Sequence, residues 1–244
     1  YASLFISAPI RSASPELTAM PNDNSVAIAM LAKAPIPGLT KTRLIPSIGA
    51  HAAAVLQERL TERAVETAVS AGIGSVALWC SPRINQSSFQ DLTRRFSIVL
   101  KQHPEGDLGH RLLGAIAAQN GPTLVIGTDC PALTSEHFRE AAQVLDDADV
   151  VLIPAEDGGY VLIGARAVHL DLFAGIAWST SAVLAQKRTR IGALSLKALE
   201  LPTLCDVDTE ADLARCEILF PEMALYALQP EQHQPEQDQQ RCAD

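Results

Sequence analysis

The feature that most constrains the fold is an alternation of strand-length apolar runs with longer segments of helical periodicity. The series opens with the run VAIAMLA at 26–32, which is continuous enough for a strand buried on both faces. Further strands are predicted at 75–80, 96–100, 123–127, 150–154, 160–164 and 199–204, and helices at 51–71, 111–119, 135–145, 179–190 and from 209 onward. The alternation predicts an α/β fold with a mostly parallel sheet and helices on both faces.

Two of these runs, at 150–154 and 160–164, lie too close together for a helical crossover. Parallel neighbours need a connection of a dozen or more residues, so this pair is predicted to be antiparallel and the sheet to be mixed. Ligands of such sheets bind beyond the carboxyl ends of the strands. The loops at that edge are therefore the candidates for chemistry.

Charge and cysteine content exclude several classes of protein. The chain carries a net charge of −9, which disfavours a nucleic-acid binder or a protein held on an anionic membrane. Its five cysteines are odd in number and form no C-x-x-C pair, so a disulfide framework or a structural zinc site is not expected. No apolar run reaches membrane-spanning length. A reducing, cytoplasmic location is predicted.

Both ends differ in composition from the middle. Residues 1–24 are rich in Ser, Ala and Pro and are predicted to be a flexible leader. Residues 229–244 are rich in Gln, Glu and Pro and are predicted to be a disordered tail. One catalytic domain is expected over 25–228.

The loop after the first strand, KAPIPGLTKTR, holds three cations and no acid. Prolines stiffen it and a glycine lets backbone amides approach a ligand, so it is predicted to hold the phosphates of a nucleotide. It lacks the spacing of a Walker A loop or a G-x-G-x-x-G fingerprint. A solvated surface loop is the alternative. The residues assigned to this loop's function are Lys33, Pro37, Gly38, Lys41, Thr42 and Arg43.

Thr128 and Asp129 follow the strand TLVIG directly. A carboxylate at the end of a central strand points into the ligand crevice, where it suits Mg²⁺ or Mn²⁺ bound to phosphates. The alternative is that Asp129 begins the next turn, although Thr134 or Ser135 is better placed to cap the following helix. Cys130 is predicted to be a packing residue, because no histidine is paired with it.

Asp206 and Asp208 follow the last predicted strand. Alternate residues of an extended segment face the same way, so either carboxylate could join Asp129 on a metal ion. The alternative is a structural role for this segment, because the sequence Thr209-x-x-Asp212 resembles a capping box for the final helix. Both roles are compatible.

Two glycine-containing loops complete the candidate site. The sequence GDLGHR could hold a nucleobase edge or a phosphate with its amides, and the glycines of EDGGY could let a sugar, a base or an acceptor lie against the backbone. The alternatives are an ordinary helix N-cap for the first and a hairpin turn for the second. The residues concerned are Gly106, Asp107, Gly109 and Arg111, with Asp157, Gly158 and Gly159.

Taken in order, AKAPIPGLTKTRL, GDLGHR, IGTDCPAL, PAEDGGYVLIG and DVDTEADL resemble an uncharacterised bacterial family of the glycosyltransferase-A, or nucleotide-diphospho-sugar transferase, type. The resemblance covers about 26–220. The lysine-arginine loop and the DVDT sequence are also similar, more distantly, to the guanylyltransferases that make molybdenum and deazaflavin cofactors. The resemblance to the bacterial family implies that family's three-layer fold, nucleotide phosphates at Lys33, Lys41 and Arg43, and a divalent metal at Asp129 with Asp206 or Asp208. Two departures are the absence of the D-x-D metal motif at the end of the central strand, where only Asp129 stands, and APIPG in place of L-x-G-G-x-S.

The sequence thus predicts a metal-dependent transferase that uses a nucleoside triphosphate or a nucleotide sugar, with Mg²⁺ or Mn²⁺ as cofactor. Three cations in one loop favour a triphosphate and hence nucleotidyl transfer. The alternatives are a glycosyltransferase and a nucleotide-binding protein without catalysis. A small-molecule acceptor is the expected partner, whereas the base, the acceptor and the oligomeric state are not specified by these motifs.

Overall fold

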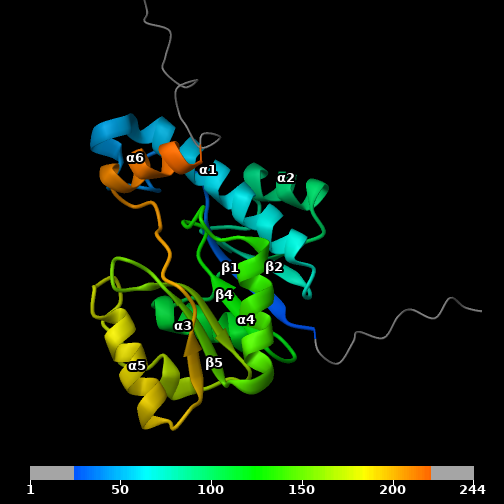
Figure 1. Cartoon of the computed structure of the whole chain (residues 1–244). Coiled ribbons are helices and arrows are strands. Elements are labelled where there is room, and N and C mark those ends of the chain that lie inside the picture. Colours follow the sequence, from blue (N-terminus) through cyan, green and yellow to red (C-terminus); the bar gives the residue numbers. More distant parts are fainter. Residues whose placement is uncertain (1–24, 221–244) are drawn as a thin grey trace, which may run out of the picture.

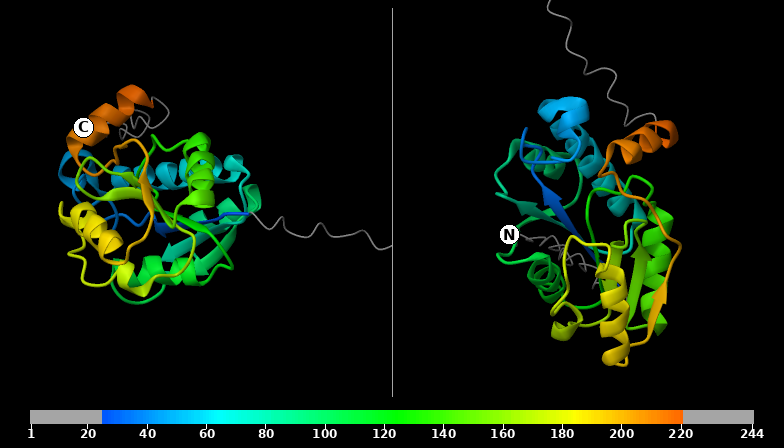
Figure 2. Two further views of the ribbon diagram at one scale, coloured as in Figure 1. Left: turned by 60° about the horizontal axis from the view of Figure 1, so that its bottom comes forward. Right: turned by 90° about the vertical axis from the view of Figure 1, so that its left-hand side faces the viewer.

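The computed structural model describes residues 25–220 of the 244-residue chain (Figure 1). The predicted leader at 1–24 and tail at 229–244 lie outside the described residues, as do positions 221–228 of the predicted domain. The described residues form three layers, with one sheet between two sets of helices (Figure 2). They include no helix long and apolar enough to cross a membrane.

A single seven-stranded sheet forms the middle layer, in the order β3-β2-β1-β4-β6-β5-β7. All neighbours are parallel except β6, which runs antiparallel to both β4 and β5. The predicted antiparallel pair is therefore confirmed, as is the mixed sheet. The strands are β1 (Ala27–Lys33), β2 (Val76–Ser81), β3 (Val99–Gln102), β4 (Thr123–Ile126), β5 (Val150–Pro154), β6 (Tyr160–Ala165) and β7 (Ala198–Glu200).

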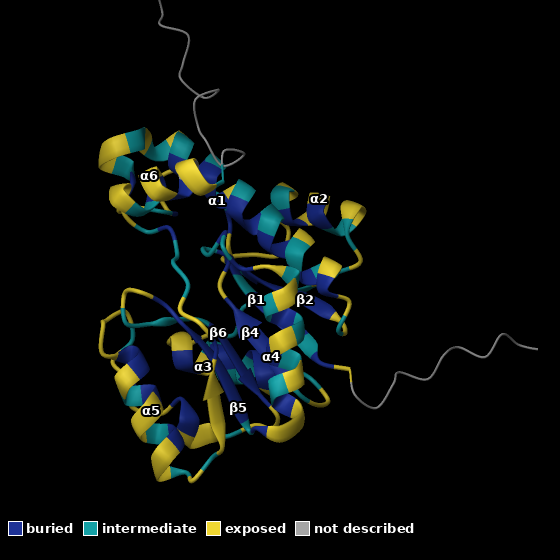
Figure 3. Ribbon diagram, in the orientation of Figure 1, coloured by how far each residue is buried: buried dark blue, intermediate teal, exposed yellow. Residues whose placement is uncertain are grey.

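Helices cover both faces of the sheet because the side chains of each strand alternate between them. On β1, Ile28 and Met30 pack under α1 (Ile45–Ala71), α2 (Ser87–Arg95) and α4 (Ser135–Asp147). Ala29 of the same strand faces α3 (Leu108–Ala117) and α5 (Val183–Ala193), which follows the short helix η1 (Leu170–Leu172). Figure 3 shows the central strands buried between these layers.

The last helix, α6 (Glu210–Leu219), lies against the first part of α1, at the top of Figure 1. Leu213 and Cys216 of α6 pack there with Leu44 and Leu56 in a separate small core. The chain between β7 and α6 therefore crosses the carboxyl edge of the sheet. This crossing brings the DVDT sequence to the loop that follows β1.

The predicted helix caps are present. Asp107 caps α3 by accepting from the backbone N–H of His110, and Thr134 caps α4. Thr209 and Asp212 form the capping box of α6. These caps confirm the structural alternatives for GDLGHR and DVDT, and they leave room for the ligand roles beside them.

Several predicted boundaries are wrong, each for a physical reason. Helix α1 begins at Ile45 because its first turn, with Pro46, precedes a kink at Gly49 (φ 80°). Strand β7 ends at Glu200, and only an isolated bridge from Leu204 to Ala155 continues the predicted run 199–204. Helix α2 was not predicted because its exposed polar face leaves only two buried residues, Phe89 and Leu92. The remaining bounds differ from the predictions by a few residues.

Candidate functional site

The candidate site lies beyond the carboxyl ends of β1 and β4, where three separate segments meet. The loop after β1 brings Lys41, the loop after β4 brings Asp129, and the chain before α6 brings Asp208. The backbone of the last two segments is joined by one hydrogen bond, which the N–H of Val207 donates to the carbonyl of Asp129 at 2.9 Å. The predicted convergence of these loops is therefore present.

Lys41 is the centre of the site. Its side chain is 3% exposed, and its Nζ lies 2.8 Å from Asp129 Oδ1 and 3.4 Å from Asp208 Oδ1. It also donates to the carbonyl of Val207 at 2.6 Å. Burial opposes the charged form of this amine, but the two carboxylates outweigh burial and raise the pKa of Lys41 above its usual value. Lys41 is therefore a permanent cation held between two acids.

Arg43 extends the same cluster towards solvent. Its guanidinium donates to Asp208 Oδ2 at 3.2 Å, and its side chain is 66% exposed. A solvated ion pair of this kind contributes little to stability, about 0–1 kcal/mol. Arg43 can therefore exchange its carboxylate partner for a phosphate at small cost.

A buried amide links the two loops that carry Lys41 and Asp129. Gln57 of α1 accepts a hydrogen bond from Thr40 Oγ1 at 3.1 Å and donates to Thr128 Oγ1 at 3.0 Å. Its second amide hydrogen goes to Thr61 Oγ1 at 3.2 Å. Because Thr40 precedes Lys41 and Thr128 precedes Asp129, this network fixes both halves of the ion pair. Gln57 was not among the predicted site residues, since a single polar residue within a helix gives no functional signal.

Backbone conformation also marks the site. Lys41 and Ser179 have φ values of 46° and 63°, in the left-handed region that residues other than glycine rarely adopt. Only Ser195, among the described residues other than glycine, shares this conformation. Ser179 lies in the loop before α5 and borders each of the three cavities described below. Such residues tend to cluster at functional sites, where the surrounding structure maintains them.

Three adjoining cavities surround this cluster, each named here for one residue that lines it. The Lys41 cavity, of about 300 Å³, is lined by Lys33, Thr42, Arg43, Asp129 and Asp208 among others. The Arg111 cavity, of about 360 Å³, contains Lys33, His103, Arg111, Thr128 and Asp129. The Asp157 cavity, of about 400 Å³, contains Arg43, Asp157, Gly159, Tyr160, Trp178 and Asp208. Loops from the whole carboxyl edge of the sheet therefore enclose one continuous region.

The remaining predicted residues line none of these three cavities. Pro37 and Gly38 are exposed at the tip of the first loop, and Gly106 and Asp107 form the turn that caps α3. Gly109 packs under Trp178, where an added Cβ would lie 3.0 Å from the indole ring. Gly158 (φ 88°) faces the Ser181 carbonyl, so a side chain there would clash with the backbone. Among these, Gly109 and Gly158 have packing roles that account for glycine.

Asp206 borders the site without lining these cavities. Its carboxyl group is more than half buried, and burial together with repulsion from Asp157, Asp208 and Asp129 raises its pKa to about 6. The pKa of the neighbouring Cys130 thiol is raised to about 12, mainly by burial. Cys130 thus stays protonated at neutral pH, as expected for a packing residue.

The donor set for a divalent cation consists of carboxylate oxygens. Asp129 and Asp208 each place one oxygen within 3.4 Å of the same atom, the Lys41 ammonium nitrogen. Hard oxygen donors converging on one cationic position fit Mg²⁺ or Mn²⁺ chemically. Within residues 25–220, however, no three His, Cys, Asp or Glu side chains are arranged as a metal cluster. The positive charge at this point is supplied by Lys41.

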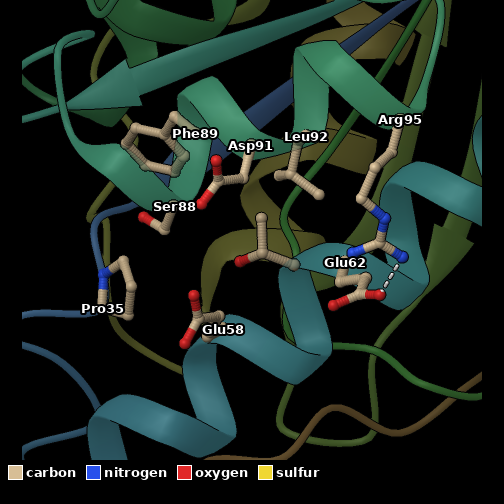
Figure 4. Close-up of a pocket in the computed structure, with 9 residues that line it drawn as sticks. Pro35, Glu58, Glu62, Ser88, Phe89, Asp91, Leu92 and Arg95 are labelled. Carbon is tan, nitrogen blue, oxygen red and sulfur yellow. Dashed lines mark hydrogen bonds and ion pairs between the residues drawn. The ribbon is translucent and has the colours of Figure 1, made fainter.

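A fourth cavity, of about 140 Å³, lies apart from these residues, between α1 and α2 (Figure 4). Its rim carries Glu58, Glu62 and Asp91, and Phe89 and Leu92 provide its apolar side. Arg95 reaches across to Glu62 in an ion pair. No residue predicted to act in the site lines this cavity.

Four further residues that line the cavities were not among the predicted site residues. His103, Tyr160, Trp178 and Ser179 lie one or a few residues beyond a recognised motif or in the loop before α5. Tyr160 ends the EDGGY sequence and could have been included with it. His103 follows β3, whose predicted end at residue 100 is two residues short of its real end, so its place at the carboxyl edge was not evident.

About half of the sequence matches a known protein family. Residues 64–180 match the family described as "Uncharacterized protein conserved in bacteria (DUF2064)", a stretch that contains GDLGHR, IGTDCPAL and PAEDGGYVLIG. The predicted family resemblance is confirmed. The loop with Lys41 and the DVDT sequence lie outside the matched stretch. No curated protein matches the sequence.

Solved structures share the fold. A protein of Desulfovibrio desulfuricans G20, provisionally named a nucleotide-diphospho-sugar transferase, is 23% identical with a TM-score of 0.68, over 81% of this chain and 97% of that one. A CMP:2-keto-3-deoxy-manno-octonic acid synthetase complexed with CTP is 13% identical, with a TM-score of 0.54 over 82% and 100%. A nucleotidyl transferase of Methanothermobacter thermautotroptrophicus is 15% identical, with a TM-score of 0.54 over 82% and 99%. The predicted nucleotide-diphospho-sugar transferase type of fold is thereby confirmed.

Proposed function

We propose that this protein is a metal-dependent nucleotidyltransferase that acts on a nucleoside triphosphate and a small-molecule acceptor. The observation that supports the proposal is the meeting of Lys41 and Arg43 with Asp129 and Asp208 in one cavity. Cations beside paired carboxylates are the arrangement that binds a polyphosphate together with a divalent ion. The fold shared with a nucleotidyl transferase and with a CTP-bound synthetase agrees with this reaction.

The first loop would hold the triphosphate. Lys41 and Arg43 would neutralise the charge that develops on the departing pyrophosphate, and Lys33 borders the same cavity. Asp129 and Asp208 would hold Mg²⁺ or Mn²⁺, with Asp206 beside them; the bound ion would polarise phosphate oxygens. The Gln57 network would keep Lys41 and Asp129 in place throughout.

The Asp157 cavity would receive the acceptor, because it adjoins the Lys41 cavity through Arg43 and Asp208. An acceptor oxygen would attack the α-phosphorus, forming a new phosphorus–oxygen bond as the bond to pyrophosphate breaks. No covalent enzyme intermediate is required, which agrees with the protonated state of Cys130 at neutral pH.

Glycosyl transfer from a nucleotide sugar is the second candidate, favoured by the fold shared with the Desulfovibrio desulfuricans protein. The two reactions differ in the leaving group, which is pyrophosphate in one and a nucleoside diphosphate in the other. Coupled assays for both products, run over candidate donors and acceptors with Mg²⁺ or Mn²⁺, distinguish them.

Binding provides the first test. Nucleoside triphosphates and nucleotide sugars are compared by thermal shift and calorimetry, with and without Mg²⁺, for the wild type, R43M and R94M. We expect a triphosphate with Mg²⁺ to give the largest stabilisation, about 2.7 kcal/mol at a ligand concentration a hundred times Kd. R43M should bind roughly tenfold more weakly. R94M, which removes an exposed arginine paired with Asp91 on α2, is the charge-matched control. Equal affinity of R43M and R94M would remove the first loop from the proposal.

A further inference from the structure

The Arg111 cavity contains three basic side chains that lack acidic partners. Lys33 ends β1, His103 follows β3, and Arg111 lies in the first turns of α3. Within residues 25–220, none of the three makes a side-chain hydrogen bond or an ion pair. The acid that borders this cavity, Asp129, is already paired with Lys41. The cavity therefore carries unbalanced positive charge in a chain whose net charge is −9.

Arg111 differs in this respect from several surface arginines. Arg94, Arg139, Arg188 and Arg215 all pair with carboxylates. The Nε of Arg111 is instead buried and has no hydrogen-bond partner. A buried charged donor without an acceptor is unfavourable, and in native structures such groups usually have a functional explanation.

The charges of Arg111 and Lys33 reach His103. Burial first, and then these two cations, lower the pKa of His103 to about 4. The imidazole is thus neutral at physiological pH, and the field that keeps it neutral would be cancelled by an anion placed between the three side chains. Apolar side chains, including Leu31, Leu112 and Val125, also line the cavity.

We propose that the Arg111 cavity is a second oxyanion subsite, which binds a phosphate or carboxylate group through Arg111 and Lys33 with His103 beside it. The subsite is distinct from the pair formed by Lys41 and Arg43, since both of these cations already have carboxylate partners. Its assignment to the transfer reaction rests on the proposed function. In that reaction, the subsite would place an anionic group of a substrate next to the polyphosphate, since Lys33 borders both cavities.

Inorganic phosphate is the probe for this subsite. The full chain is titrated with phosphate while the imidazole resonances are followed by NMR, and H103Q identifies the His103 signal among the six histidines. We expect bound phosphate to raise the pKa of His103 by one unit or more, because a neighbouring anion stabilises the imidazolium. A His103 pKa that stays constant at saturating phosphate would overturn the proposal.

Variants separate the subsite from general anion binding. R111M should weaken phosphate binding at least tenfold and raise the free-state pKa of His103, because a charge that opposes protonation is gone. K33M, at an exposed position, should weaken it less and provides the same test if R111M does not fold. R94M on α2 is the control and should bind phosphate as the wild type does. Equal phosphate affinity in R111M, K33M and R94M would contradict the assignment.

A competition experiment identifies the source of the anion and keeps the two proposals apart. If a nucleoside triphosphate and phosphate bind together, the subsite receives an anion of the second substrate. If they exclude each other and R111M weakens both, it receives a phosphate of the nucleotide itself. If phosphate shifts His103 but no nucleotide binds under any ionic condition, the oxyanion subsite stands and the nucleotidyltransferase proposal fails.

Discussion

The backbone N–H of Val207 donates to the carbonyl of Asp129, and this bond fastens the chain before α6 to the loop after β4. Lys41 donates to the carbonyl of the same Val207, so the cation is fixed by main-chain atoms as well as by carboxylates. The charge cluster thus depends on the crossing of the chain from β7 to α6. Its energetics can be tested one side chain at a time.

Removal of the central cation should expose the repulsion between its partners. In K41M, Asp129 and Asp208 would face each other without the ammonium that separates them. We expect a loss of about 1–3 kcal/mol in the free energy of unfolding, less than for a fully buried pair because both acids are partly solvated. The double variant K41M/D129N should recover part of this loss. Urea denaturation measures both effects, and the absence of any recovery would show that Lys41 stabilises the fold by packing alone.

Substitution of Gln57 should weaken triphosphate binding as well as destabilise the fold. Q57M keeps the volume of the side chain but leaves the hydroxyls of Thr40 and Thr128 without their amide partner. The expected destabilisation is about 1–3 kcal/mol, with weaker triphosphate binding in addition. T123V, which removes one buried hydroxyl and its hydrogen bond at the opposite end of β4, is the control for a loss of stability away from the site. Both variants should lose stability, but only Q57M should lose affinity.

Asp206 gives the site a defined pH dependence. Its pKa of about 6 in the folded protein lies above its ordinary value of 3.8. The folded state therefore holds this proton more tightly than the unfolded chain does, and its stabilising effect is lost as the pH rises through that interval. D206N removes the charge, so it should stabilise the protein at pH 7 by on the order of 1 kcal/mol, a value reduced for the solvated part of the group. Equal stability of D206N and wild type at pH 7 would contradict the raised pKa.

Lys187 should produce the opposite pH dependence. Its side chain is fully buried, donates to the Leu172 carbonyl at 2.6 Å, and faces the rings of Phe173 and Trp178. Burial, with repulsion from Arg190, lowers its pKa from 10.5 to about 7. Because the unfolded chain binds this proton more tightly, stability should rise between these two pH values. K187M should abolish that rise, which unfolding free energies measured across the interval would reveal.

The sequence was sufficient to predict the mixed sheet, the antiparallel pairing of β5 with β6 and the meeting of Lys41, Arg43, Asp129 and Asp208. Apolar runs such as VLIP and the motifs at strand ends carry that information locally, because a short continuous apolar run is typical of a strand buried on both faces. The edge at which ligands bind then follows from a general rule of α/β topology, whereas the order of the strands was not predicted.

What could not be predicted depends on contacts between distant segments. Lys41 pairs with both carboxylates that were predicted to hold a metal ion, a contact that requires the β7–α6 crossing to bring Asp208 next to the first loop. Gln57 acquires its importance from hydroxyls of two other segments. The unbalanced charge of Arg111 is visible only when all the acids around it have been placed. Pairwise geometry of this kind leaves no periodic pattern in the sequence.

The reversed direction of β6 has a practical consequence. Because β6 starts at the edge where β4 and β5 end, the loop between β5 and β6 lies on the same side of the molecule as the other segments of the candidate site. Within residues 25–220, the opposite side carries exposed links, such as those at Asn120 before β4 and Lys197 before β7. A fluorophore or surface tether attached there would leave the cavities accessible, so the protein can be immobilised for ligand screening with its working side facing the solution.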